Sequence, residues 1–240
     1  SGECWLRIGR AYQRLVLTLC TCKCSPTLMS AIALPMSKPY FHTVSPDSNC
    51  SRVVGLHRNS EPPIDYENPS SIETCAAAIK SEGPFHLIIN TVGVLHSHEW
   101  MPEKKLDDLN ADQLIELMKI NSIGPALTIR HFSQLLDPQQ SIMVTLSAKV
   151  GSIEDNRLGG WYSYRASKAA LNMIIKTASI ELARTKPNTV MIAMHPGTVN
   201  SRLSKPFRGE QIGRPASIAA AEMFQVIENL ELNDSGSFLT

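Results

Sequence analysis

The fold of this chain is decided by SIMVTLS at residues 141–147, a long helical stretch at residues 162–184, and TVMIAMH at residues 189–195. The first and last of these are short runs of apolar and β-branched side chains, which favours buried strands. The stretch between them is long enough to cross back over a sheet as a helix. We therefore expect a strand, a helix and a second strand parallel to the first.

The same alternation continues on both sides of this unit. Further strand-like runs lie at residues 52–57, 86–91 and, more weakly, 236–240, and further helical patterns lie at residues 70–80, 111–136 and 215–230. Strands that alternate with helices are typical of a parallel sheet covered on both faces. The sequence therefore predicts an α/β fold, with a Rossmann-type doubly wound parallel sheet in a single domain.

Length and composition narrow the class of function. The chain has 240 residues, a formal net charge of +1 and 19% charged residues, so it has room for one large core and lacks the basic field of a nucleic-acid binder. Its apolar runs are shorter than the roughly 20 residues of a membrane span. We expect a soluble, cytoplasmic protein that binds a small molecule, with no nucleic acid and no membrane as partner.

The N-terminal part, residues 1–50, differs from the rest, and we expect the folded domain to occupy residues 51–240. Residues 1–46 contain five basic residues and the single acid Glu3, a bias that an organelle transit peptide or an ordinary basic leader would explain. Five of the six cysteines also lie in residues 1–50. The run CTCKC at residues 20–24 lacks the spacing of a zinc site, so free thiols are favoured and no metal is expected.

Candidate site residues follow three of the expected strands. Ligands of parallel α/β sheets bind beyond the carboxyl ends of the strands, where NTVG (residues 90–93), Ser147 and HPGTVNS (residues 195–201) lie. Tyr164 and Lys168 then open the next helix, one turn apart. A hydroxyl, a phenol and an ammonium are therefore expected to meet at one edge of the sheet.

These three groups suit proton transfer to a carbonyl oxygen. A cation one helical turn away favours the phenolate, so Lys168 is expected to lower the pKa of Tyr164 from its usual value near 10. Ser147 can donate a hydrogen bond to the substrate oxygen, while hydride must come from a cofactor because no side chain can deliver one. Taken singly, a Tyr and a Lys at this spacing are more often a surface pair. Their order and placement together indicate carbonyl reduction or its reverse.

Asn121 is a further candidate. It continues the apolar stripe of Leu114, Leu117 and Met118 in its helix, so its amide is expected to face inward. A buried amide must be hydrogen-bonded. We expect Asn121 either to brace a loop or to hold a water molecule.

Together these residues resemble the short-chain dehydrogenase/reductase family from about residue 53 to residue 240. The string VGSIEDNRLGGWYSYRASKAALNM, at residues 150–173, is similar to the C-factor subgroup. The resemblance implies a carbonyl reductase that depends on NADP or NAD. It implies that Tyr164 is the general acid/base, that Lys168 also holds the nicotinamide ribose, that Ser147 orients the substrate, and that Asn121 relays protons through water.

The resemblance also implies a set of cofactor contacts along the strand ends. Asn90 and Gly93 would line the adenine side of the cofactor cleft. The turn formed by Pro196 and Gly197 leads to Thr198, which would lie near the nicotinamide amide.

Two residues nearer the N-terminus complete the implied cofactor site. Arg58 matches a position where the family often places a basic residue against the 2′-phosphate, which favours NADP over NAD. Asp65 matches a stretch of the family that contacts adenine. Members of the family commonly form homodimers or homotetramers, and we expect the same here.

The N-terminal part departs from the family pattern, so the first strand and helix unit is expected to be atypical. The family places a glycine-rich turn after its first strand, but no glycine lies between Gly9 and Gly55. Three explanations are open: a mis-spliced or frameshifted gene prediction, an isoform or pseudoenzyme that has lost cofactor affinity, and a working enzyme with a rebuilt pyrophosphate loop. The last is disfavoured because a side chain at a close-approach glycine would push the phosphates away.

The alternative to an oxidoreductase is a catalytically impaired protein of the same fold that acts as a non-catalytic interaction or regulatory protein. The two hypotheses differ in whether the chain binds a dinucleotide.

Overall fold

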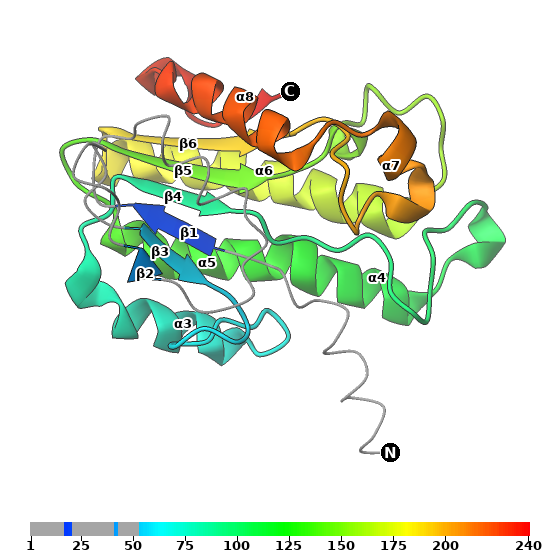
Figure 1. Cartoon of the computed structure of the whole chain (residues 1–240), viewed down its shortest axis with the longest axis horizontal. Helices are drawn as coiled ribbons and strands as arrows, with labels where there is room; N and C mark the ends of the chain where they lie inside the picture. The colour runs from blue at the N-terminus through cyan, green and yellow to red at the C-terminus, as the bar shows by residue number, and fades with distance from the viewer. Residues whose placement is uncertain (1–16, 21–40, 43–52) are drawn as a thin grey trace.

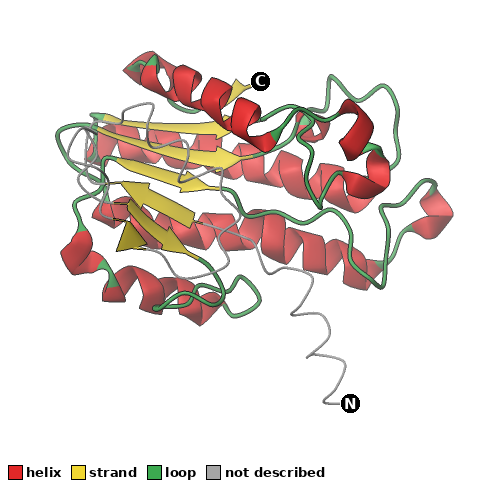
Figure 2. Cartoon of the chain, in the orientation of Figure 1, coloured by secondary structure: helices red, strands yellow, loops and turns green. Residues whose placement is uncertain are grey.

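The computed structural model describes residues 17–20, 41–42 and 53–240, and these form a seven-stranded sheet with helices on both faces (Figures 1 and 2). The strand order is β2-β3-β1-β4-β5-β6-β7. The strands are β1 (Leu17–Cys20), β2 (Phe41–His42), β3 (Val53–Leu56), β4 (Leu87–Asn90), β5 (Ser141–Leu146), β6 (Thr189–Met194) and β7 (Phe238–Leu239). The predicted Rossmann-type α/β class is confirmed.

The helices of the described part form two layers. They are α3 (Pro69–Ala78), α4 (Ala111–Met118), α5 (Gly124–Phe132), α6 (Tyr162–Thr185), α7 (Gly209–Ile212) and α8 (Ala216–Glu228). Buried side chains of α3, α5 and α6 belong to one core cluster, whereas those of α8 belong to a second one. Figure 1 shows α8 on one side of the sheet and the long α6 on the other.

Alternation along the strands divides the core between these two layers. Ile88 in β4 packs into the cluster under α3, α5 and α6, whereas its neighbours Leu87 and Ile89 pack into the cluster under α8. All four residues of β4 are buried. Both faces of the sheet are therefore covered, as the unbroken apolar run of this strand predicts.

Strand β1 runs against its neighbours, and the sequence did not predict it. Leu17 pairs with Asn90 and Cys20 with Leu87, so β1 is antiparallel to β4, and it is antiparallel to β3 as well. The carboxyl ends of β4, β5 and β6 share one edge of the sheet, and the carboxyl end of β1 lies at the opposite edge. The first unit is therefore atypical, as expected.

Two short segments from the N-terminal fifty residues thus take part in the sheet, namely β1 and β2. The predicted domain boundary at residue 50 stays a prediction, because most of residues 1–50, with CTCKC among them apart from Cys20, lie outside the described residues.

The long helix predicted at residues 111–136 is present but changes its winding. Asn110 caps it as expected, because its side-chain oxygen accepts a hydrogen bond from the backbone N–H of Gln113 at 3.1 Å. A π-helical turn, Lys119–Ile123, separates α4 from α5. Such turns insert one extra residue and occur often at functional sites.

Within the described residues, the structure has no helix that is both long and apolar enough to cross a membrane.

Candidate active site

The carboxyl ends of three parallel strands meet at one edge of the sheet, where the sequence placed the site. Asn90 of β4 pairs with Thr145 of β5, and Leu146 of β5 pairs with Met194 of β6. The backbone N–H of Ser147 continues this ladder by donating to the carbonyl of Met194 at 2.8 Å. Helix α6 then starts at this edge, so the first turns of α6 face the strand ends.

Lys168 is the cation of this edge and is almost completely buried, with 3% of its surface exposed. Its Nζ donates to the carbonyl oxygen of Leu146 at 3.1 Å and lies 5.9 Å from the ring centre of Tyr164. Burial lowers the pKa of Lys168 to about 8. A side chain at Gly93 would place its Cβ 3.3 Å from this Nζ, so the glycine lets the loop after β4 approach the ammonium.

Tyr164 is the phenol of the pair and is 7% exposed. No hydrogen bond to its hydroxyl is found among the described residues. Burial raises the pKa of Tyr164 above its ordinary value. The expected lowering by Lys168 is not met, because desolvation of the phenol raises its pKa.

The Ser147 hydroxyl has a partner on α6 other than the phenol. Its hydroxyl donates to the side-chain oxygen of Asn172 at 2.5 Å. Asn172 lies on α6 two turns beyond Tyr164, which is about 12 Å along the helix axis. No hydrogen bond joins Ser147 to Tyr164 or Lys168 within the described residues. The structure therefore brings Tyr164 and Lys168 together, and it ties the Ser147 hydroxyl to Asn172, which lies further along α6.

Asn121 lies in the π-helical turn and is fully buried. Its Oδ1 accepts from the backbone N–H of Val94 at 2.8 Å, and its Nδ2 donates to the carbonyl of Val94 at 2.8 Å and to Ser167 Oγ at 3.1 Å. The amide thus braces the loop after β4 against α6, which is one of the two roles expected from the sequence. A role in a proton relay stays a prediction.

Asn90 is also fully buried, and its side chain belongs to an internal network. Its Oδ1 accepts from the backbone N–H of Val92 at 3.0 Å, and its Nδ2 donates to the Tyr66 hydroxyl at 2.9 Å. That hydroxyl also bonds Thr128 Oγ1 at 2.6 Å. Asn90 therefore shapes the start of the loop that carries Gly93, while any contact with a cofactor stays a prediction.

Arg58 is paired within the chain. Its Nη2 lies 3.0 Å from Asp65 Oδ1 and 3.1 Å from Glu67 Oε1, so two carboxylates surround the guanidinium. A phosphate would have to compete with both of them. The predicted roles of Arg58 toward a 2′-phosphate and of Asp65 toward adenine have no further support from this arrangement.

The turn after β6 is fixed by an arginine that the sequence did not single out. Gly197 has a φ of +72°, which favours glycine, and the Arg214 guanidinium lies against it and donates to the carbonyl of Pro196 at 2.6 Å. The backbone N–H of Arg214 donates to the carbonyl of Thr198 at 2.9 Å. Arg214 therefore holds the segment that was expected to contact the nicotinamide amide.

His195 precedes this turn and is half-buried, with its Nδ1 left without a hydrogen-bond partner. Burial is the main cause that lowers the pKa of His195, so its imidazole is neutral near pH 7. Within the described residues, no group of three or more His, Cys, Asp or Glu side chains is arranged to hold a metal ion.

Sequence reasoning missed Glu103 and the aromatic rings around the pair. The Trp161 ring centre lies 6.2 Å from that of Tyr164 and 4.9 Å from that of Phe207. Glu103 is 2% exposed and contacts Ser163, the residue before Tyr164. None of these residues has a local signal, because each reaches the site from a loop without periodicity.

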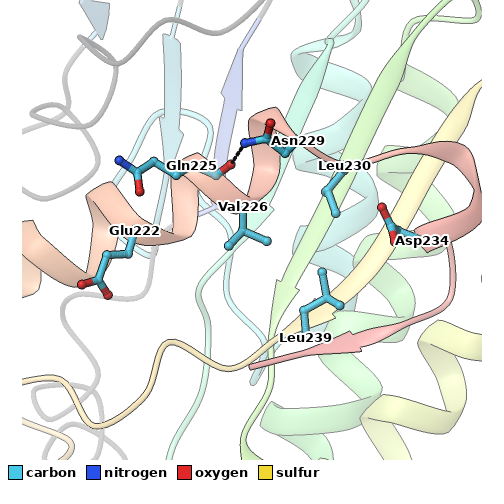
Figure 3. A pocket seen from close by; sticks show the side chains of 7 residues that line it. All are labelled: Glu222, Gln225, Val226, Asn229, Leu230, Asp234 and Leu239. Carbon is cyan, nitrogen blue, oxygen red and sulfur yellow. Dashed lines mark hydrogen bonds between the residues drawn. The ribbon is translucent and has the colours of Figure 1, made fainter.

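A surface pocket lies elsewhere, between α8 and β7 (Figure 3). Its lining residues are Glu222, Gln225, Val226, Asn229, Leu230, Asp234 and Leu239. None of them is a candidate site residue, and α8 covers the face of the sheet opposite α6. The pocket is therefore separate from the Tyr164 and Lys168 pair.

The parallel strand ends and the buried Tyr and Lys define the class as a Rossmann-type oxidoreductase scaffold, and known proteins agree. Residues 62–211 match the family model described as short chain dehydrogenase. The chain is 34% identical over 179 residues to 1-hydroxy-2-glutathionyl-2-methyl-3-butene dehydrogenase of Rhodococcus sp. (strain AD45), which covers 74% of this chain and 75% of that one. The chain belongs to the short-chain dehydrogenase/reductase family.

Two further similarities refine this placement. The chain is 31% identical over 157 residues to the C-signal protein of Myxococcus xanthus, covering 65% of this chain and 88% of that protein. The NADPH-bound carbonyl reductase from chicken fatty liver superimposes with a TM-score of 0.63 at 26% identity, covering 74% of this chain and 73% of that one. The C-factor-like relationship that the string at residues 150–173 indicated is thereby confirmed.

Proposed function

We propose that the chain interconverts a carbonyl compound and an alcohol, with NADP(H) as the hydride carrier and Tyr164 as the general acid/base. The single observation that carries this proposal is the buried Tyr164 and Lys168 pair at the carboxyl edge of the sheet, next to the close approach at Gly93. Family membership supports the class of reaction. The alternative of a non-catalytic protein has no specific observation in its favour.

Part of a dinucleotide site fits the described residues. Lys168 and the turn at Pro196–Gly197 form an edge that would hold the nicotinamide and its ribose, and Gly93 leaves room beside the Lys168 ammonium because it has no side chain. The part of the site that would hold the pyrophosphate lacks the family's features. The carboxyl end of β1 lies at the other edge of the sheet, and no glycine occurs between Gly9 and Gly55. We propose NADP rather than NAD because the chicken carbonyl reductase is bound to NADPH.

In the reductive direction NADPH held at this edge would supply the hydride that the carbonyl carbon takes up, and would leave as NADP⁺. The Tyr164 hydroxyl donates its proton to the carbonyl oxygen, so the carbonyl becomes an alcohol and the phenol becomes a phenolate. The raised pKa of Tyr164 keeps the phenol protonated but makes it a weak acid, so the nearby positive charge of Lys168 is proposed to favour loss of the proton during the transfer. Protonated Lys168 then stabilises the phenolate until a proton returns.

The proposed role of Ser147 requires a local change. Its hydroxyl has to exchange its hydrogen bond to Asn172 for one to the substrate oxygen. The side chain of Asn121 is hydrogen-bonded to both the backbone N–H and the carbonyl of Val94. We propose that it relays protons through water bound near the π-helical turn.

We further propose a homodimer or homotetramer, and a cytoplasmic location. Large apolar side chains remain exposed on α4 and α6, with Ile115 at 64%, Met173 at 66% and Ile180 at 50% exposure, and these would be covered by a second copy. Light scattering of the purified chain tests the assembly, since a monomer at micromolar concentration would contradict it.

The function is tested by following NADPH oxidation with a panel of aromatic and aliphatic aldehydes and ketones. We expect turnover by the unmodified chain and none above background by Tyr164→Phe, which lacks only the hydroxyl. The variant Tyr162→Phe, two residues away on the same helix, is the matched control and should keep its rate. Turnover that survives in Tyr164→Phe would exclude the proposed proton donor.

A further inference from the structure

Helix α6, which carries Tyr164 and Lys168, has no cap of its own. Its N-cap residue is Trp161, whose φ of +54° is unusual for a bulky side chain and whose indole makes no capping hydrogen bond. The first N–H groups of any helix lack partners within the helix. Something outside α6 must therefore satisfy this end, because Ser163 in its first turn is fully buried.

Glu103 satisfies it from sixty residues away in sequence. Both carboxylate oxygens accept from the backbone N–H of Ser163 at 3.3 Å, and Oε1 also accepts a short hydrogen bond from Ser163 Oγ. The backbone carbonyl of Glu103 accepts from the N–H of Trp161 at 2.5 Å. Gly160, with a φ of +63°, passes so close that an added Cβ would lie 3.2 Å from this carbonyl.

The carboxylate is buried, with only 2% of the residue exposed. Among the described residues, the hydrogen-bond partner of the carboxylate is Ser163 in the first turn of α6, and Ser163 is not a cation. A helix N-terminus carries a partial positive charge that favours a nearby carboxylate. A buried charge that is matched only by a helix end is costly to keep, which indicates that its position matters.

We propose that Glu103 is a positioning residue for Tyr164. By holding Ser163 through its carboxylate and Trp161 through its backbone, it fixes where α6 begins and therefore where the phenol stands relative to the strand ends. Glu103 does not touch the reacting atoms.

The loop that carries Glu103 is itself anchored, so it can act as a fixed support. Asn121 holds Val94 at one end of this loop, and Gln113 Nε2 donates to the carbonyl of Met101 at 3.1 Å near the other. Glu103 follows Met101 by two residues. The same loop thus contributes Gly93 next to Lys168 and Glu103 at the start of the helix that carries Tyr164.

The structural half of the proposal is tested without any activity, by amide hydrogen exchange of the full chain measured by mass spectrometry. Glu103→Gln keeps the size of the side chain but removes its charge and one of the two acceptor oxygens that face Ser163. We expect exchange in peptides covering residues 161–168 to become about tenfold faster, a change typical of a lost cap, while peptides covering residues 171–185 stay unchanged. Glu154→Gln, at an exposed glutamate in the preceding loop, is the matched control.

Unchanged exchange at the start of α6 in Glu103→Gln would overturn the proposal, even if the proposed enzymatic function were correct. Equal acceleration throughout α6 would also overturn it, because Glu103 would then support the whole helix rather than its first turn. Glu103→Asp should restore part of the protection, since it keeps the charge but shortens the reach.

The catalytic half rests on the proposed function and is read as a double-mutant cycle. We expect Glu103→Gln and Ser163→Ala each to lower kcat for a reduced carbonyl by about tenfold, with the KM for NADPH within about twofold, and the double variant to be no worse than the poorer single one. Losses that multiply would show that the two residues act separately. A chain inactive in all forms, with exchange altered as expected, would reject the proposed function and leave the positioning role intact.

Discussion

Lys168 is the residue whose protonation state we expect to affect both the stability of the fold and the proposed chemistry of the site. It is 3% exposed, and its ammonium has one carbonyl acceptor, on Leu146. Burial lowers its pKa to about 8, so near neutral pH the folded chain holds a charged amine in a poorly solvated place. In the proposed reaction this charge would stabilise the phenolate formed at Tyr164.

Replacement of Lys168 by methionine tests this assignment through stability. The unfolded lysine titrates at 10.5 and the folded one at about 8, so the unfolded chain binds more protons between these values and the folded chain gains stability as pH rises. The unmodified chain should therefore gain about 2 kcal/mol relative to Lys168→Met between pH 7 and pH 9.5. Urea unfolding at both pH values measures this. A difference that does not change with pH would contradict the lowered pKa.

Ser147 can be examined by truncation. If its hydroxyl leaves Asn172 to bind the substrate oxygen, Ser147→Ala should lower kcat/KM for a carbonyl substrate by about one hundredfold while NADPH affinity is kept. Asn172→Ala is the comparison, because it frees the hydroxyl without removing it and should not lower kcat/KM to the same degree. Full activity in Ser147→Ala would show that the serine has only a structural role, in which its hydrogen bond to Asn172 joins the end of β5 to α6.

At the scale of elements, the helix from α4 to α5 shows how a buried polar network shapes the site. The π-helical turn presents Asn121 to the loop after β4, and the next turn presents Gly124 and Thr128 to Tyr66. An added Cβ at Gly124 would lie 2.2 Å from Tyr66 Cδ2, so the ring packs directly on the helix backbone. The glycine is required here by close approach rather than by its φ.

Gly124→Ala should therefore displace the Tyr66 ring and break its hydrogen bonds to Asn90 and Thr128. We expect a loss of about 2–4 kcal/mol in the free energy of unfolding, measured by urea titration. Gly159→Ala is the contrast: it meets nothing within 4 Å but has a φ of +65°, and it should lose only about 1 kcal/mol. Combining Gly124→Ala with Tyr66→Leu should recover part of the lost stability. If the losses of the two single variants simply added, Gly124 and Tyr66 would not be in contact.

How much the sequence predicted differs from element to element. The strands at residues 86–91, 141–147 and 189–195 and the helices α3, α6 and α8 follow from apolar periodicity, because each buries one stripe or both faces. Strand β1 could not be predicted, because LTLC has only four residues and takes its place through pairing with β3 and β4. Tertiary pairing of this kind leaves no periodic signal.

Part of the site could also be predicted from the sequence. Tyr164, Lys168 and Asn121 lie at the expected edge, since helical spacing and inward stripes fix which way they point. The partner of Ser147 was not predictable, because one residue of rotation at a strand end decides whether a side chain meets one turn of α6 or another. Glu103 was missed because its contact with Ser163 spans sixty residues.

At the scale of the whole molecule, the central question is how the N-terminal part joins the sheet. Leu17 and Leu19 are fully buried and share the core cluster of α3, α5 and α6, although β1 opposes β3 and β4 in direction. The edge that carries Tyr164 and Lys168 is therefore built on a sheet whose third strand, β1, comes from the segment that departs from the family pattern.

Shortening a buried side chain of β1 tests the place of this strand in the fold. Leu19→Ala should destabilise the chain by about 2–5 kcal/mol, as expected for a buried leucine in a packed core. Leu158→Ala, at a side chain that is 92% exposed, should change stability by less than about 0.5 kcal/mol. Chemical unfolding of the two variants measures both values. Equal stability of the two would show that β1 does not belong to the centre of the sheet.

The most direct test of the proposed oxidoreductase is a titration of the purified chain with NADPH and NADH, followed by calorimetry. The account predicts micromolar binding of NADPH, weaker binding of NADH, and loss of NADPH affinity in Lys168→Ala but not in Tyr164→Phe. A folded chain that binds neither dinucleotide would contradict it, because Tyr164 and Lys168 would then have no hydride donor to act with.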